Sequence, residues 1–195
     1  MRHMGAGGLA FAMMLALLGC VAPGAGVPVL SGAVTLAPPQ GYCIEPGSRR
    51  EREDTAILIA GRCADEAARP AAVLTATVGA DGSGSGVDVT TGRAELAAFF
   101  RSTAGRKALS RRGRAADVQV LEAIGTPQAF LLRLTDRAPQ SGTGVQAESW
   151  RAVLPVNRRL VSLTVTGPAA GPLDREAGHL LIRDFVAATV AANRK

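Results

Sequence analysis

The sequence predicts an α+β domain, in which helices pack on an antiparallel β-sheet. Two observations come from the second half of the chain: short runs of alternating apolar residues are separated by brief turns, and one long apolar stripe with helical spacing follows them at the C-terminus. A second, shorter stretch with helical spacing precedes these runs. Because brief turns join antiparallel neighbours, we expect a four-stranded meander, flanked by two main helices, with the C-terminal helix packed on the sheet.

The N-terminus has the pattern of an export signal. Arg2 and His3 precede an apolar stretch over residues 5–18, which is shorter than the roughly 20 apolar residues of a membrane-spanning helix. The stretch ends at Leu17-Leu18-Gly19-Cys20, which resembles the lipobox of bacterial lipoproteins. We therefore predict a signal peptide over residues 1–19.

The lipobox resemblance implies that Cys20 becomes the lipidated N-terminus, with acyl chains such as palmitate in the membrane. An ordinary signal peptide, cleaved near Ala25, and an uncleaved anchor are the alternatives. Val21 is not the aspartate that marks inner-membrane retention in some bacteria. We expect a periplasm-facing lipoprotein, in the outer membrane rather than the inner one.

The chain has three cysteines, and lipidation or removal of Cys20 leaves Cys43 and Cys63 as a pair. In an oxidising compartment we expect a disulfide, which would close a loop of roughly 20 residues and stabilise the fold by about 3 kcal/mol. Two buried free thiols are the alternative. These two cysteines and His179, the one histidine after the signal peptide, are too few for a four-ligand zinc site. We expect no metal and no other cofactor.

Residues 20–33 are rich in Pro, Gly and Ala and are predicted to be the lipidated cysteine and a flexible tether. Residues 34–195 are predicted to form a single domain, which is an ordinary length for one hydrophobic core. Ser48–Asp54 carries mixed charges, so we expect a solvated turn or short helix there. Strands or extended segments are expected at Val34–Ala37, Gly41–Pro46, Ala56–Ala60 and Ala71–Val78.

The first main helix is predicted from Gly92 or Arg93 to Arg112, with Thr91 as its N-cap and Gly113 as its stop. The second begins near Asp174. Its apolar stripe consists of Ala177, Leu181, Ile182, Phe185, Val186 and Val190.

Four strands are predicted between the helices. Val118, Val120 and Ile124 are expected on one face of the first strand, and Pro155–Arg158 is expected to connect the third strand to the fourth. The other three strands alternate at Phe130/Leu132/Leu134, at Trp150/Ala152/Leu154 and over Leu160–Thr166.

The formal net charge is +6, which favours anionic partners. A basic cluster in and after the first helix is the candidate surface for contact with an anionic membrane or polyanion; a solvated helix face is the alternative. No nucleic-acid partner is expected, because the aromatic residues that stack on bases do not interleave with this cluster. Its members are Arg101, Arg106, Lys107, Arg111, Arg112 and Arg114.

Catalytic patterns are weak. A triad would have to use His179, which we expect on the polar face of the last helix as a surface residue. The glycine-rich stretch Asp81–Gly86 lacks the Lys-Ser/Thr of a phosphate-binding loop and is predicted to be a surface loop. We predict that the protein is not an enzyme.

The element order over residues 34–194 resembles the Mog1/PsbP/DcrB-like class, and Gly41–Pro46 and Arg62-Cys63 look like short signatures of uncharacterised bacterial envelope proteins. The resemblance implies a binding or assembly module without catalysis. We expect a lipid-anchored cell-envelope protein that acts through contacts with a protein partner or a surface. The alternative is a periplasmic module that binds a small ligand or peptide on the sheet face away from the terminal helix. A deep apolar pocket would favour the alternative.

Overall fold

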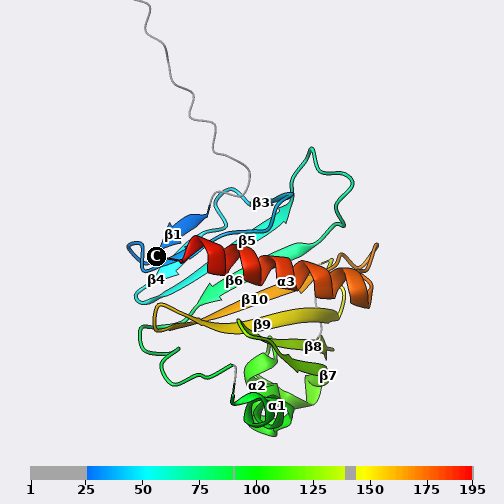
Figure 1. The fold of residues 1–195 in the computed structure, drawn as a ribbon. Helices are drawn as coiled ribbons and strands as arrows, with labels where there is room; N and C mark the ends of the chain where they lie inside the picture. The colour runs from blue at the N-terminus through cyan, green and yellow to red at the C-terminus, as the bar shows by residue number, and fades with distance from the viewer. Residues whose placement is uncertain (1–25, 90, 139–143, 195) are drawn as a thin grey trace, which may run out of the picture.

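The computed structural model describes residues 26–89, 91–138 and 144–194. Its architecture is the predicted α+β class: a large antiparallel sheet with the C-terminal helix packed on it (Figure 1). The strands are β1 (Val27–Val29), β2 (Val34–Leu36), β3 (Tyr42–Ile44), β4 (Arg50–Arg52), β5 (Thr55–Arg62), β6 (Val73–Val78), β7 (Val118–Gly125), β8 (Phe130–Asp136), β9 (Glu148–Val156) and β10 (Arg159–Thr166). The helices are α1 (Arg93–Arg101), α2 (Thr103–Leu109), the 3-10 turn η1 (Ala115–Asp117) and α3 (Arg175–Ala192).

The large sheet has the strand order β3-β5-β6-β10-β9-β8-β7, and β4 pairs with β5 beside β3. The predicted meander is confirmed, because β7, β8, β9 and β10 are consecutive neighbours. The first half of the chain adds β6 next to β10, so the sheet is wider than the meander alone. Because successive side chains of each strand point to opposite sides, the sheet has two faces, and different elements pack on each of them.

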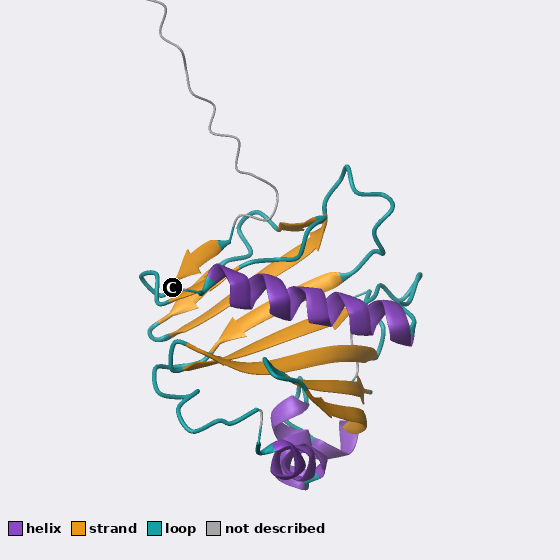
Figure 2. Cartoon of the chain, in the orientation of Figure 1, coloured by secondary structure: helices purple, strands orange, loops and turns teal. Residues whose placement is uncertain are grey.

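α3 covers one face of this sheet and crosses it diagonally (Figure 2). Its apolar stripe packs on the alternating residues of β9 and β10, such as Trp150, Leu154 and Leu163. Within the described residues, helices cover the opposite face only at its β7–β8 end. There Phe100 of α1 stacks on Phe130, with the ring centroids 5.8 Å apart. The opposite face of β6 and β10 thus carries no helix in the described part of the chain.

The folded part begins earlier than predicted. β1 lies inside the segment predicted to be a flexible tether, and it pairs with β2 in a separate two-stranded sheet. Val29 is 0% exposed, because its side chain packs in the core beneath α3. The tether prediction is therefore wrong for residues 27–33, which form β1 with Pro28 at its middle and the turn to β2 that contains Gly32.

The mixed-charge segment Ser48–Asp54 is also different from the expectation. Residues Arg50–Arg52 form the exposed edge strand β4 instead of a helix or a plain turn. Charged side chains suit such an edge, because they discourage pairing with another chain.

The first predicted helix is broken into α1 and α2. Ser102 is extended, and its hydroxyl accepts a hydrogen bond from the Gly105 backbone N–H at 3.1 Å, which caps α2. A Cβ on Gly105 would lie 2.0 Å from the Phe99 carbonyl oxygen, so glycine permits the close approach. Thr91 is not the N-cap, since Gly92 occupies that place and the Thr91 hydroxyl bonds to Asp88. α2 also ends at Leu109, before the predicted end.

A β-bulge changes the faces of β7. The register with β8 shifts between Val120 and Glu122. Val118 and Val120 pack under α1 and α2, whereas Ile124 packs on the α3 face. The prediction that these three residues share one face is therefore wrong, because the extra residue of a bulge reverses the alternation.

The hairpin between β9 and β10 is tighter than predicted. Pro155 and Val156 belong to β9, and only Asn157 and Arg158 form the turn. Both turn residues have positive φ, 46° and 69°, as in the two-residue turns whose twist matches a hairpin.

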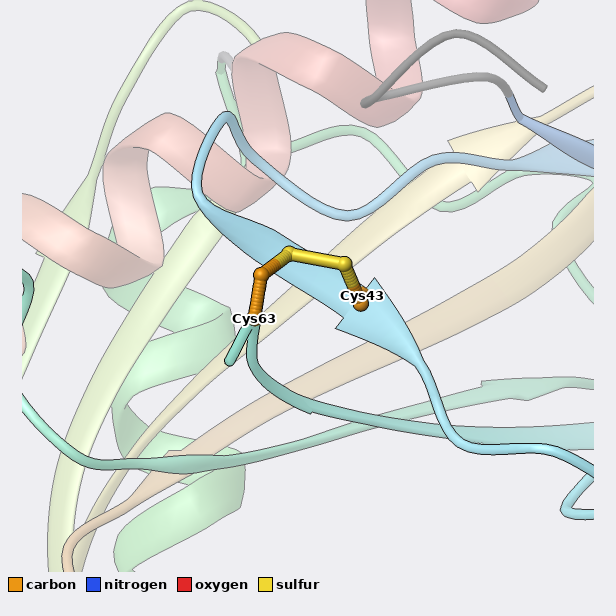
Figure 3. The surroundings of a disulfide bond; sticks show 2 residues. All are labelled: Cys43 and Cys63. Atoms are coloured by element: carbon orange, nitrogen blue, oxygen red, sulfur yellow. A yellow bond between two sulfur atoms is a disulfide. The ribbon is translucent and has the colours of Figure 1, made fainter. Parts of the chain in front are cut away.

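The disulfide joins Cys43 in β3 to Cys63, the residue after β5, as Figure 3 shows. The two strands are paired in register, with Cys43 opposite Gly61. The predicted pairing is confirmed, and the bond links the edge strand β3 to the sheet.

Candidate functional site

An apolar groove lies between α3 and the β7–β8 hairpin, with a volume of about 780 Å³. Ile124 and Leu131 lie along its strand side. Leu180, Val186 and Ala187 lie along its helix side. Leu180 is 52% exposed, so apolar surface continues from the groove onto the solvent face of α3. We call these five residues and the space between them the α3 groove.

The β-bulge helps to form the α3 groove. It turns Ile124 towards α3, opposite Leu131 on β8. The turn that follows, Gly125–Gln128, closes one end of the groove. The Thr126 hydroxyl holds this turn, since it donates to the Ala129 carbonyl and accepts from the Ala129 N–H. The strand side of the groove is therefore held in a defined geometry.

His179 lies at the groove and is not simply the solvated surface residue that we predicted. It is partly buried, and its ring stacks on Trp150 with centroids 4.7 Å apart. The Trp150 Nε1–H donates to the Arg175 carbonyl at 3.2 Å. Gly178 allows this contact, because a Cβ there would lie 2.6 Å from Trp150 Cδ1. The His179 ring is therefore held against Trp150 at the edge of the groove.

The polar rim of the α3 groove carries both signs of charge, with Arg183 and Asp184 on α3. Near the start of α3, Arg175 and Arg133 both donate to Glu122 of β7. These cations, with Arg175 the larger cause, lower the pKa of Glu122 from its ordinary value to about 2, although partial desolvation opposes them. The network holds the N-terminal end of α3 beside the strands.

The basic cluster does not form one free cationic surface. Arg111 pairs with the buried Asp136, Arg114 pairs with Asp117, and the Arg106 guanidinium donates to the Arg101 carbonyl at 2.7 Å. The other three cations of the cluster are exposed. Two of the six cations are therefore paired with carboxylates, and contact of the whole cluster with an anionic surface stays a prediction.

A second, more polar cavity of about 400 Å³ lies on the sheet face that α3 does not cover. Arg151 and Asp136 line it together with several threonine and serine side chains. Burial raises the pKa of the Asp136 carboxyl, but hydrogen bonds from the Arg111 and Ala138 backbone N–H groups outweigh this and lower it overall. We call this space the hydroxyl cavity.

The residues of neither site were predicted from the sequence, although the alternative expectation placed a small ligand or peptide on the sheet face where the hydroxyl cavity lies. Leu180 is an apolar residue on the polar side of the last predicted helix, between His179 and Arg183. This exception to the helical pattern could have indicated an exposed apolar site there. Arg151, an arginine between Trp150 and Ala152 on a buried strand, was the signal for the hydroxyl cavity. Cys20, the predicted lipidation site, lies outside the described residues.

In the part of the chain that the structure describes, no helix is both long and apolar enough to cross a membrane. Among the same residues, no three His, Cys, Asp or Glu side chains are grouped so that they could hold a metal ion. Comparison of the sequence with protein-family models and with curated proteins found no match to either.

Proposed function

We propose that the protein is a non-catalytic, lipid-anchored component of the bacterial cell envelope, which holds an apolar segment of a protein partner in the α3 groove. The observation that carries the proposal is the groove itself. It has an apolar lining and an exposed leucine, Leu180, at its edge, so the apolar surface extends out of the groove. The lipobox resemblance at Cys20 and the Cys43–Cys63 disulfide support the envelope location.

A protein segment suits the α3 groove better than an enclosed small molecule does. Protein interfaces have an apolar centre and a polar rim. Here Leu131 and Val186 lie at the centre, whereas Arg183 and Asp184 lie at the rim and offer both signs of charge. The apolar surface also extends onto the exposed side of α3 at Leu180, where a small ligand would leave it uncovered.

The test is site-specific photocrosslinking in intact envelopes. A photoreactive amino acid at Leu180 should give one discrete protein adduct, and the same residue at Phe99 should not. Phe99 is the matched control because it is 47% exposed and lies on α1, on the other side of the sheet. Introducing Ala187→Glu beside the crosslinker should remove the adduct, because it places a charge in the groove.

Binding of a neutral fluorescent probe distinguishes the small-ligand alternative from a protein partner. Trp150 is the single tryptophan, and its ring stacks on a residue of the groove, so a bound N-phenyl-1-naphthylamine should accept its excitation energy. Probe binding that Ala187→Glu abolishes, together with no protein adduct at Leu180, would support a small apolar ligand and contradict the protein partner. Equal adducts at Leu180 and Phe99 would contradict a specific site at the groove.

A further inference from the structure

The hydroxyl cavity contains an arginine whose hydrogen-bonding capacity is largely unused. Arg151 projects from β9 on the face away from α3, and among the described residues its side chain donates one hydrogen bond, from NH1 to the Leu109 carbonyl at 3.3 Å. Its Nε atom is buried and has no hydrogen-bond partner. No ion pair joins its guanidinium to a carboxylate within the described ranges. Such a group normally has a partner, because an unpaired buried donor costs about 1–3 kcal/mol.

The nearby carboxylate is already engaged. Asp136 lines the same cavity, but it accepts hydrogen bonds from the backbone and the side chain of Arg111 and from the Ala138 N–H. Two guanidinium groups and one carboxylate leave one net positive charge at this end of the cavity. Burial lowers the pKa of the Arg151 guanidinium from its ordinary value, and the attraction of the Asp136 carboxylate opposes this only in part. A single negative charge from outside would balance the site.

A row of hydroxyl groups leads away from Arg151. The β-sheet register places Thr164 of β10 directly opposite Arg151 on one side and directly opposite Thr75 of β6 on the other. In the same way Ser162 lies opposite Thr77. Within the described chain, the side chains of these four residues form no hydrogen bond with another residue, and all of them line the cavity. A hydroxyl can donate and accept, so the row matches a ligand that carries hydroxyls of its own.

We propose that the hydroxyl cavity binds a small hydroxylated carboxylate, with its carboxylate on Arg151 and its hydroxyls along the row from Thr164 to Thr75. The planar guanidinium presents donors in a fork that fits a carboxylate. The volume of about 400 Å³ accommodates a molecule of sugar-acid size. This site lies on the opposite face from the α3 groove and does not depend on the function proposed for the groove.

The test is isothermal titration calorimetry of the purified protein with sodium D-gluconate. D-sorbitol, the uncharged analogue, and inorganic phosphate, an anion without the hydroxylated chain, are the comparison ligands. Gluconate should bind, and both others should bind at least tenfold more weakly. Arg151→Met should weaken gluconate binding by about ten- to a hundredfold, because it removes a charged hydrogen-bond partner. Thr164→Val should weaken it by about three- to tenfold through the loss of one hydroxyl.

Two control variants define the site. Arg52→Met removes an exposed arginine outside the cavity, and Ala187→Glu alters only the α3 groove. Both should keep the gluconate affinity of the unmodified protein. Equal binding of gluconate in the Arg151, Thr164 and Arg52 variants would overturn the proposal. So would absence of gluconate binding, or phosphate binding as tight as that of gluconate.

Stability measurements separate a binding role from a structural one. Without ligand, Arg151→Met should unfold at the same temperature as the unmodified protein or at a higher one, because replacing an unpaired buried cation by an apolar chain relieves its desolvation. With gluconate, only proteins that retain Arg151 should gain thermal stability. A lower unfolding temperature for Arg151→Met, with Thr164→Val leaving gluconate affinity unchanged, would assign Arg151 a purely structural role and overturn the proposal.

Discussion

Arg175, the first residue of α3, binds Glu122 of β7 through two hydrogen bonds, from Nε to Oε1 at 2.6 Å and from NH2 to Oε2 at 2.7 Å. The two residues are 53 positions apart in the chain. Arg133 of β8 donates to the same Glu122 Oε1 at 2.6 Å. One carboxylate therefore ties the start of the helix to two strands beside the α3 groove.

Glu122→Gln should lower the free energy of unfolding by about 1 kcal/mol at pH 7, because it removes two charge-assisted interactions from a partly exposed network. The pKa of Glu122 is about 2 in the folded protein and about 4.5 when unfolded, so the stabilisation is complete above pH 4.5. It should be lost progressively as the pH falls towards 2. Urea unfolding of both proteins across this range measures the difference.

The control for this experiment is Asp65→Asn, at an exposed position that forms no ion pair within the described residues. It should change stability little at either pH. A Glu122→Gln penalty that stays constant between pH 7 and pH 2 would show that lost packing, and not charge, is its cause.

The side-chain amide of Asn193, the C-cap of α3, should be required for full stability of the folded protein. Its Oδ1 accepts from the Thr35 N–H at 2.9 Å, and its Nδ2 donates to the Thr35 carbonyl at 2.7 Å, which joins α3 to β2. Asn193→Asp cannot donate to that carbonyl, so it should destabilise the protein about as much as Asn193→Ala, by about 1–3 kcal/mol. Thermal unfolding of the two variants checks this, with Arg194→Ala next to it as the control.

If Asn193→Asp matched the stability of the unmodified protein, the donated bond to Thr35 would contribute nothing, and β1–β2 would be held by apolar burial alone. Hydrogen exchange at Thr35 would show the same outcome directly. Its amide should exchange faster in both variants and no faster in the Arg194 control.

Gly105→Ala should destabilise the protein, although helix propensity predicts a gain of about 1 kcal/mol. The new Cβ would lie 2.0 Å from the Phe99 carbonyl oxygen and 2.6 Å from the Phe100 Cα, and both are backbone atoms that cannot rotate away. We expect a loss of at least about 2 kcal/mol by chemical unfolding. Ala108→Ser, at an exposed position of α2, is the control. A stabilised Gly105→Ala variant would mean that α1 and α2 can separate without cost.

The Cys43→Ser/Cys63→Ser double variant should lose about 3 kcal/mol of unfolding free energy, since the bond closes a loop between residues that are 20 positions apart. Chemical unfolding with and without dithiothreitol measures it. Reductant should lower the stability of the unmodified protein to that of the double variant and leave the double variant unchanged. No effect of reductant on the unmodified protein would contradict the assigned role.

Local patterns predicted much of the fold. The alternation over Leu160–Thr166 and the stripe from Ala177 to Val190 identified β10 and α3, because each buries one face and its period is visible in the chain. The cysteine pair was also predictable. The α1–α2 break and the β7 bulge were not, because each depends on a backbone contact that has no periodic signal: Gly105 against α1, and Val120 against β8.

The candidate sites show the same division. The sequence contains Leu180 and Arg151 as exceptions to their local patterns, but a single exception does not say what surrounds it. The α3 groove exists because α3 packs over β9 and β10 and leaves the β7–β8 end uncovered. The hydroxyl cavity exists because β6 pairs with β10, which brings Thr75 into line with Thr164 and Arg151.

By itself, the sequence determined the α+β class, the meander, the C-terminal helix and the Cys43–Cys63 pair, because these follow from periodicity and residue type within short stretches. The tertiary structure alone decided the order of the outer strands, the inclusion of β1 in the fold, the break at Ser102 and the surroundings of Arg151. The physical reason is that these features depend on contacts between residues distant in the chain, whose free energies are set by packing and desolvation and not by local preference.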